Sequence, residues 1–260
     1  MHTAVTHPLP RAGGRGAEDR TPPWWAPAVL PGRWSVAALA VVLGLVLLHL
    51  LGVLLRRDGA EFPVSELLLR LVDLNGERTL PAWFSTILLL LVAQASWLLA
   101  GTSAATGRGR WVGYERALAA IFVFLSIDEL TSIHETTTTP LRTALGLGGI
   151  LTYAWVVLYV PLVVVVGLVY LRWIRSLPVV AARLVYASGL LYVGGAAGVE
   201  LVGAGLAAAG EKDSWAYTAA VVFEETGEML GALLMLSVLT WLRLTRERRI
   251  PAPQSVAEWS

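Results

Sequence analysis

Residues 120–135 read AIFVFLSIDELTSIHE, an apolar run whose second half carries four ionisable side chains. Together with the residues before it, the run is long enough to cross a bilayer as a helix, which takes about 20 residues. A charged side chain near the centre of such a helix costs about 2.5–3.5 kcal/mol. The presence of ionisable side chains in a membrane span at about 117–136 therefore requires an explanation; they are Asp128, Glu129, His134 and Glu135.

The whole chain has the composition of a membrane protein. Of its 260 residues, 56% are hydrophobic and 15% are charged, and the mean hydropathy is +0.64. Soluble domains contain about 45–50% apolar and about 25% charged residues. The net charge of +1 indicates no basic surface for nucleic acid. The absence of cysteine excludes disulfides, thiolate metal sites and a cysteine nucleophile. The composition thus excludes a soluble enzyme.

Six apolar segments predict an all-α transmembrane bundle of six helices within one domain, residues 33–244. The segments lie at about 34–55, 82–100, 117–136, 151–171, 182–209 and 215–242. Residues 1–32 and 245–260 are expected to be loose cytoplasmic tails because they are polar and rich in Arg, Gly or Pro. An amphipathic helix at about 65–75, capped by Ser65 and ended by Gly76, is expected either in the outer interface or packed on the bundle.

The basic residues orient this bundle. Fourteen of the twenty Arg and Lys residues fall on the side of the two termini, and six fall on the other side. Because positive charge favours the cytoplasmic side, both termini are predicted in the cytoplasm of a multi-pass cell-membrane protein. Aromatic residues at the span ends, Trp155 among them, fit an interfacial belt.

Seven carboxyl groups fall inside three of the apolar segments. They are Asp128, Glu129 and Glu135 in the third segment, Glu200 in the fifth, and Glu224, Glu225 and Glu228 in the sixth. On an ideal helix Asp128, Ser132 and Glu135 lie within about 60° of arc, and the three glutamates of the sixth segment lie within about 100°. Glycines allow close helix approach in the fifth and sixth segments, at Gly194, Gly195, Gly198, Gly203, Gly227 and Gly231.

No Arg or Lys accompanies these acids in the middle of the spans. A structural network of ion pairs would need fixed positive partners. The counter-charge must therefore come from protons, metal ions or a cationic ligand, and an acidic site is expected between the third, fifth and sixth spans. Carboxyl groups crowded together cannot all be ionised, so some should hold protons at neutral pH.

Some of these positions also have purely structural interpretations. His134 lies about 100° from the stripe of Asp128 and Glu135 on an ideal helix, so it could be a packing residue as well as a ligand. His49 is a lone histidine in an apolar span, where hydrogen-bonded packing is the commoner role. Glu135 could end its helix before the following threonines, and Glu129 could bind a neighbouring backbone group.

Three strings carry a resemblance to known proteins: LSIDELTSIHE at 125–135, YVGGAAGVE at 192–200 and EETGEMLG at 224–231. They resemble an uncharacterised family of bacterial multipass membrane proteins. The resemblance covers the third to sixth spans and implies that these residues form one unit in a bacterial inner membrane, but it implies no activity. A looser chemical analogy is to membrane-embedded terpene cyclases and prenyltransferases, whose acids protonate an alkene or epoxide or bind magnesium diphosphate.

The first functional hypothesis is an intramembrane enzyme that acts on a lipophilic substrate, such as an isoprenoid, terpenoid or other lipid. Carboxyl groups that hold protons in a dry cavity are strong general acids, and this chemistry needs no cofactor. The candidate catalytic residues are Asp128, Glu129, Glu200, Glu224 and Glu228. In a second form of the hypothesis Mg²⁺ or another divalent cation binds a diphosphate, and the candidate ligands are Asp128, His134, Glu135, Glu224, Glu225 and Glu228.

Two other classes of function are open. The same carboxyl groups suit a transporter or channel for protons or metal cations. A non-catalytic assembly or sensor subunit is the third class, although each hydrogen bond between its helices would contribute only about 0.6–2 kcal/mol. In every case the expected partners are membrane lipids and a small lipophilic molecule, and not nucleic acid.

Overall fold

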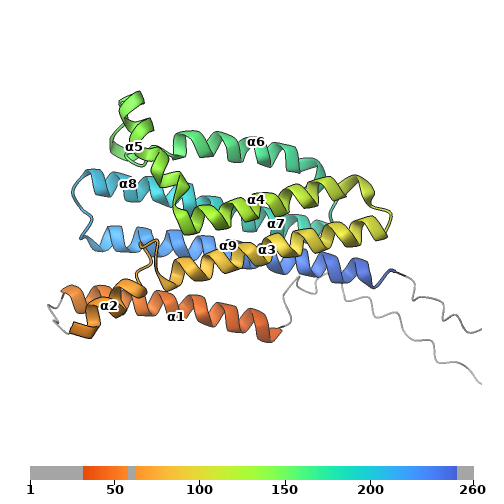
Figure 1. Ribbon diagram of the computed structural model, residues 1–260, viewed down its shortest axis with the longest axis horizontal. Coiled ribbons are helices and arrows are strands. Elements are labelled where there is room, and N and C mark those ends of the chain that lie inside the picture. Colours follow the sequence, from red (N-terminus) through yellow and green to blue (C-terminus); the bar gives the residue numbers. More distant parts are fainter. Residues whose placement is uncertain (1–31, 58–62, 251–260) are drawn as a thin grey trace, which may run out of the picture.

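The structure is a computed structural model that describes residues 32–57 and 63–250, and all regular structure in these residues is helical. The predicted tails, apart from Gly32 and residues 245–250, lie outside the described residues. The long helices run side by side along one direction (Figure 1). The α-helices are α1 (Gly32–Arg57), α2 (Pro63–Leu71), α3 (Leu80–Ala105), α4 (Val112–Thr131), α5 (Ile133–Leu145), α6 (Val156–Ile174), α7 (Val179–Val193), α8 (Glu200–Ala208) and α9 (Trp215–Glu247). Two 3₁₀ turns, η1 (Gly109–Trp111) and η2 (Gly149–Leu151), and a π-helix, η3 (Gly194–Val199), complete the described elements.

Five helical segments of the described chain are long and apolar enough to cross a membrane, and the bent pair α4–α5 would make a sixth. The segments are Trp34–Arg57, Leu80–Ala105, Val156–Ile174, Val179–Ala208 and Trp215–Glu247. Large apolar side chains lie exposed on their outer surfaces, for example Leu190 at 76% and Phe223 at 71% exposure. Such surfaces suit a hydrocarbon solvent, so the fold is that of a multi-pass membrane protein.

The core lies where α3 packs between α4 and α9. Leu89, Val92 and Leu99 of α3 are buried in one apolar cluster with Val238 and Leu239 of α9. Close packing of this cluster fixes α3, α4 and α9 relative to one another.

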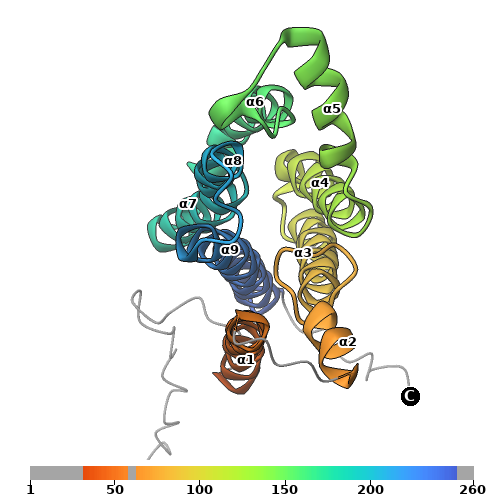
Figure 2. The same ribbon diagram turned by 90° about the vertical axis from the view of Figure 1, so that its left-hand side faces the viewer.

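At the end of the bundle where α3 is joined to α4, helix α6 is held against α4. The Tyr170 hydroxyl donates to the Tyr114 carbonyl at 2.8 Å, and the Trp173 indole donates to Glu115 at 3.3 Å. Toward the opposite end the ribbons of α6 and α4 lie farther apart, and α5 leads away from the end of α4 (Figure 2).

The third span is not the unbroken helix predicted for 117–136. Helix α4 ends at Thr131, and the axis bends by 75° into α5. Ser132 adopts the left-handed conformation, with φ of 51°. Because a left-handed residue interrupts the helical geometry, Ser132 and Glu135 do not continue the stripe of Asp128. The alternative that Glu135 ends its helix is also wrong, since α5 continues through the threonines and Pro140 to Leu145.

Other boundaries differ from the predicted ones. The expected helix at 65–75 is α2 at Pro63–Leu71, because the chain turns after Leu71 to bury Leu74. Ser65 lies inside α2 and Gly76 lies beyond its end at Leu71, so the predicted cap at Ser65 and the predicted stop at Gly76 are both wrong. The fourth span begins at Val156 instead of 151, after a 3₁₀ turn, and α9 continues past 242 to Glu247.

Two glycines of the fifth and sixth spans mark the closest helix contact. A Cβ atom built on Gly231 would lie 2.7 Å from the Tyr192 backbone nitrogen and 2.9 Å from the Ser188 carbonyl oxygen. One built on Gly195 would lie 2.7 Å from the Glu224 carbonyl oxygen. The predicted small-residue contact is thus found at these two positions and more loosely at Gly227. It is absent at Gly194 and Gly198, whose Cβ positions have no neighbour within 4 Å.

We expect Gly231→Ala to destabilise the protein, because the new methyl group would meet backbone atoms of α7 that cannot move aside. Overpacking of this kind costs about 1–3 kcal/mol, and the melting temperature in detergent should fall accordingly. Gly189→Ala is the matched control, since its Cβ position in α7 is open. Equal melting temperatures for the two variants would contradict the packing described here.

Candidate functional site

A cavity of about 460 Å³ opens at the end of the bundle where α4 ends and α9 begins. Its walls come from α4 and α5 on one side and from α6, the α7–η3–α8 segment and α9 on the other (Figure 2). The loop before α3, residues 74–77, contributes to the mouth. A volume of this size is typical of sites for small organic ligands.

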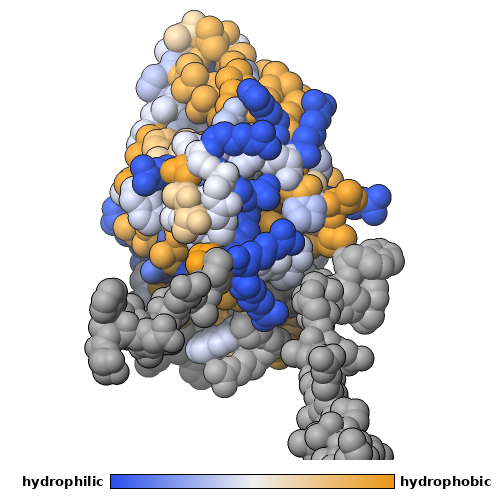
Figure 3. Space-filling view, turned by 90° about the vertical axis from the view of Figure 1, so that its right-hand side faces the viewer, coloured by the Kyte–Doolittle hydropathy of each residue, from blue (hydrophilic) through white to orange (hydrophobic). Residues whose placement is uncertain are grey.

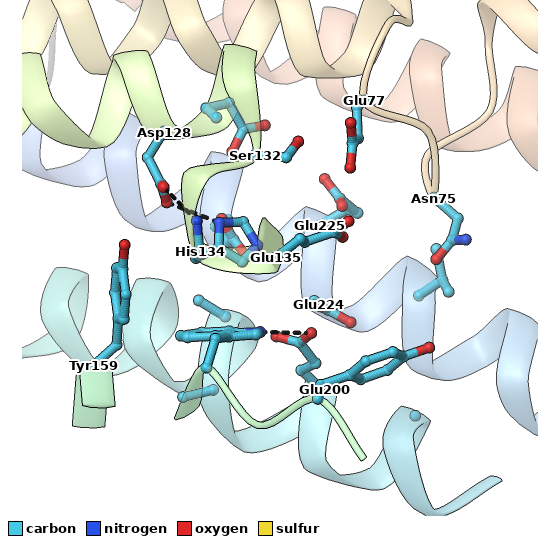
Figure 4. A pocket seen from close by; sticks show the side chains of 18 of the residues that line it. Asn75, Glu77, Asp128, Ser132, His134, Glu135, Tyr159, Glu200, Glu224 and Glu225 are labelled. Carbon is cyan, nitrogen blue, oxygen red and sulfur yellow. Dashed lines mark hydrogen bonds and ion pairs between the residues drawn. The ribbon is translucent and has the colours of Figure 1, made fainter. Parts of the chain in front are cut away.

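The structure brings all seven predicted carboxyl groups into the lining of this cavity. They are Asp128 and Glu129 from α4, Glu135 from α5, Glu200 from α8, and Glu224, Glu225 and Glu228 from α9. Figure 4 shows the side chains of Glu135, Glu200, Glu224 and Glu225 converging from separate helices. The acids are therefore neighbours through the fold, and not only along the sequence.

Asp128 and His134 form the best-defined pair of the site. One carboxylate oxygen of Asp128 accepts the His134 backbone N–H at 2.9 Å, and the other lies 2.8 Å from Nδ1 of the same residue. The break at Ser132 makes this possible, because it turns His134 back toward Asp128 (Figure 4). The predicted offset of His134 from the Asp128 stripe is wrong for that reason. With Nδ1 occupied by Asp128, the imidazole has Nε2 available for a second partner.

Trp155 holds Glu200 on the opposite wall. Its indole nitrogen donates to the Glu200 carboxylate at 2.9 Å, and its side chain is only 6% exposed. The predicted place of Trp155 in an interfacial belt is therefore wrong. Trp155 also packs edge-on against His134 and Tyr159, with ring centroids 4.9 and 5.3 Å apart. The indole thus connects the histidine on one wall to the carboxylate on the other.

The inner end of the cavity is more apolar. Leu125, Val160, Val163 and Tyr192 line it together with Glu228. The π-helix η3 lies beside α9 here, and the missing side chain of Gly195 leaves room for the Glu228 side chain, 3.4 Å from the Cβ position. A π-helical turn is wider than an α-helical one and often occurs at functional sites.

The mouth contains residues that sequence reasoning missed. Asn75, Glu77 and Lys212 line it, with Tyr153 and Tyr217 behind them, whose hydroxyl oxygens are 3.5 Å apart. Lys212 gives the cavity a basic residue from the loop before α9, which lies outside the spans that the prediction concerned. No sequence signal marks these positions, because the loops acquire their place only when α3 and α9 pack together.

Glu77 at the mouth differs electrostatically from an ordinary exposed carboxylate. Interaction with the Glu135 carboxyl group, and a smaller contribution from Ser132, outweigh the effect of burial and lower the pKa of Glu77 below its usual value of 4.5. Both carboxyl groups line the mouth, Glu77 from the loop before α3 and Glu135 from α5.

This depressed pKa predicts a pH-dependent stability. A carboxyl group whose pKa is lower in the folded state stabilises the fold above its unfolded pKa, and the contribution is lost as the pH falls through the folded value. The difference in melting temperature between pH 6 and pH 3.5 should therefore be smaller for Glu77→Gln than for the wild type. Glu66→Gln, at an exposed position of α2, is the control. If the melting temperatures of Glu77→Gln and the wild type depend on pH in the same way, the Glu77 carboxylate does not contribute to the stability of the fold.

His49 has a structural role, as its lone position in an apolar span indicates. It is 6% exposed, and its Nδ1 accepts the Leu74 backbone N–H at 3.1 Å. This bond fixes the loop before α3 against α1. His49 does not line the cavity, in contrast to His134.

Across residues 32–57 and 63–250, no group of three or more His, Asp or Glu side chains is arranged to hold a metal ion. The six candidate metal ligands therefore share a cavity without forming a coordination shell within the described chain.

Comparison with known proteins places the chain in a family. A family model described as "Domain of unknown function (DUF8692)" matches residues 34–242. The chain belongs to this family. The DUF8692 match begins in α1 and ends in α9, so it includes every residue that lines the acidic cavity. Neither the curated proteins nor the solved structures give a match to the chain. The DUF8692 description names no activity.

Proposed function

We propose that the chain crosses the bacterial inner membrane six times, with α4 and the start of α5 as the third span and both termini in the cytoplasm. The basic residues support this orientation, since most of those in the described chain lie at the end of the bundle opposite the acidic cavity. The cavity then opens toward the outer face of the membrane. Its inner, more apolar end reaches into the hydrocarbon layer.

Within this topology the proposed function is an intramembrane enzyme that isomerises or cyclises a lipophilic substrate of the isoprenoid or terpenoid class by acid–base catalysis. The apolar inner end, with Leu125, Val160 and Val163, suits a hydrocarbon chain. The aromatic rings of Trp155 and Tyr159 suit a carbocation, because the faces of aromatic rings attract positive charge.

The Asp128–His134 pair is the single observation that carries this proposal. A histidine whose Nδ1 is held by a carboxylate has its Nε2 ready to take or give a proton, as in hydrolase triads. Here the pair faces an enclosed group of carboxyl groups that can supply the proton. His49, by contrast, is buried outside the cavity, where its Nδ1 accepts the Leu74 backbone N–H and lies 3.4 Å from a carboxylate oxygen of Asp73.

The proposed reaction balances without a cofactor. The protonated carboxyl group of Glu228 gives its proton to one carbon of a substrate double bond, which leaves a carboxylate and a carbocation. The carbocation rearranges or closes a ring against the aromatic wall. His134 Nε2 then removes a proton from a neighbouring carbon to form a new double bond, and proton exchange among the cavity carboxyl groups restores Glu228. The product is an isomer of the substrate.

Lipid analysis of expressing cells tests the proposal. Wild type, Glu228→Gln and the control Glu66→Gln are produced at equal membrane levels, and the total lipid extracts are compared by chromatography and mass spectrometry. We expect an isoprenoid species of unchanged mass and altered retention with wild type and Glu66→Gln, and none with Glu228→Gln. Identical extracts from all three would refute the proposed enzyme.

A proton or cation transporter would give a different result. In proteoliposomes under a pH or cation gradient, a transporter with the same carboxyl groups dissipates the gradient in wild type and not in Glu228→Gln. The proposal predicts no gradient-driven flux above that of empty liposomes. Flux together with unaltered lipids would assign the cavity to transport.

A further inference from the structure

A second, smaller cavity lies at the end of the bundle opposite the acidic site. Its volume is about 200 Å³, and its lining consists of Ala105, Thr106, Arg108, Arg246, Arg249 and Ile250. These residues come from the end of α3, the loop that follows it and the end of α9. Figure 3 shows this end of the molecule, where hydrophilic side chains gather between apolar surfaces.

The three arginines of this cavity have only one carboxylate partner between them. Arg246 is 7% exposed, and its NH1 donates to Glu115 at 2.8 Å and to the Ser103 hydroxyl at 2.5 Å. Among the described residues no carboxylate forms an ion pair with Arg108 or Arg249. The cavity therefore carries excess positive charge around a buried, fixed guanidinium group.

Arg108 is the arginine that most needs a partner. Within the described chain its Nε atom is buried without a hydrogen-bond partner, and its NH2 donates to the Ser176 carbonyl at a long distance, 3.4 Å. Burial, and then the charge of Arg246, lower the pKa of Arg108. A buried donor without a partner destabilises the fold, so an anion in the cavity would relieve both the missing hydrogen bond and the repulsion between the arginines.

The size and position of the cavity favour a phosphate group. One guanidinium group can donate two parallel hydrogen bonds to two phosphate oxygens, and these charge-assisted bonds are strong. A volume of about 200 Å³ exceeds that of several water molecules at about 30 Å³ each. In the topology proposed above, the cavity lies at the cytoplasmic headgroup layer, where basic pockets between transmembrane helices meet anionic lipids.

We propose that Arg108, Arg246 and Arg249 form a binding site for the phosphate of an anionic phospholipid headgroup. The site is separate from the acidic cavity and does not depend on the activity proposed for it. Arg246 lies at the base of the site, held in place by Glu115 and Ser103. Arg108 contacts the phosphate from the loop after α3, and Arg249 contacts it from the end of α9.

Lipid-dependent stability of the full-length protein tests the site. Purified protein in detergent is titrated with phosphatidylglycerol, with zwitterionic phosphatidylcholine or with inorganic phosphate, and its melting temperature is followed. We expect phosphatidylglycerol to raise the melting temperature in a saturable way and phosphatidylcholine to have no effect. Stabilisation by inorganic phosphate without any by phosphatidylglycerol would assign the arginines to a soluble phosphate compound and overturn the lipid site.

Variants show whether the arginines of the cavity are responsible. Arg108→Gln and Arg249→Gln should each weaken the apparent affinity for phosphatidylglycerol about fivefold, the change expected when one basic group worth about 1 kcal/mol is lost. Without lipid, Arg249→Gln should melt like the wild type, and Arg108→Gln should melt no lower, because it removes a buried donor that has no partner. Arg175→Gln is the matched control, an exposed arginine at the same end of the bundle that does not line the cavity. An equal loss of affinity in Arg175→Gln, or no loss in the two cavity variants, would overturn the proposal.

Discussion

Replacing Asp128 with Asn is expected to lower the turnover of the lipid substrate by about 10²–10⁴-fold, while the protein still folds and inserts. The carboxylate holds His134 through its Nδ1 and its backbone N–H. An amide can keep the backbone bond, but it presents N–H to the ring and so favours the wrong tautomer. The same change in hydrolase triads lowers catalysis by about 10⁴-fold. Product formation per molecule of membrane-inserted protein is the measurement.

Asp128 acts through His134, so the experiment also needs a measurement that distinguishes a change in His134 from a loss of folding. The pH at which turnover is half-maximal should change in Asp128→Asn, whereas the melting temperature should change little. Glu66→Gln, at an exposed position outside the cavity, should retain the wild-type rate and pH profile. Wild-type turnover in Asp128→Asn would remove the pair from the mechanism.

Replacing Arg246 with Met is expected to destabilise the protein by about 3–5 kcal/mol, the usual cost of leaving one member of a buried ion pair alone. Glu115 is fully buried and keeps only the Trp173 indole, at 3.3 Å, once Arg246 is removed. At about 2–4 °C for each kcal/mol in a chain of this size, the melting temperature in detergent should fall by roughly 6–20 °C.

The double variant Glu115→Gln/Arg246→Met separates the buried charge from a general loss of packing. With both charges gone, most of the lost stability should return, since a buried ion pair adds little compared with neutral groups of similar volume. Arg175→Met, at an exposed arginine of the same end, should melt like the wild type. A double variant no more stable than Arg246→Met would show that the arginine acts by packing alone.

The long apolar helices and the meeting of the acids could be predicted from the sequence. Hydropathy marks the spans because the backbone must satisfy its own hydrogen bonds in lipid, which leaves helices as the solution for such segments. The cost of isolated charges in hydrocarbon implies that Asp128, Glu200 and Glu228 should lie together, and they line one cavity.

The geometry of the site could not be predicted in the same way. Ideal helical periodicity placed His134 away from Asp128, because nothing in the sequence requires Ser132 to be left-handed. The His134 backbone N–H donates to the Asp128 carboxylate and stabilises the break. Helix propensities do not describe a side-chain hydrogen bond of this kind. Trp155 likewise resembles an interfacial tryptophan until the η2 turn before it packs against α8 and its indole meets Glu200.

Cysteine labelling of Glu224 and its neighbour tests most directly whether the acids face a common, water-accessible cavity inside the membrane. The chain has no native cysteine, so Glu224→Cys and Phe223→Cys each carry a single thiol. Glu224 lines the cavity, whereas Phe223, the next residue on α9, lies 71% exposed on the apolar outer surface. A membrane-impermeant thiol reagent added outside intact cells should label Glu224→Cys and leave Phe223→Cys unlabelled. Labelling of Phe223→Cys alone, or equal labelling of both, would contradict an acidic cavity between the helices.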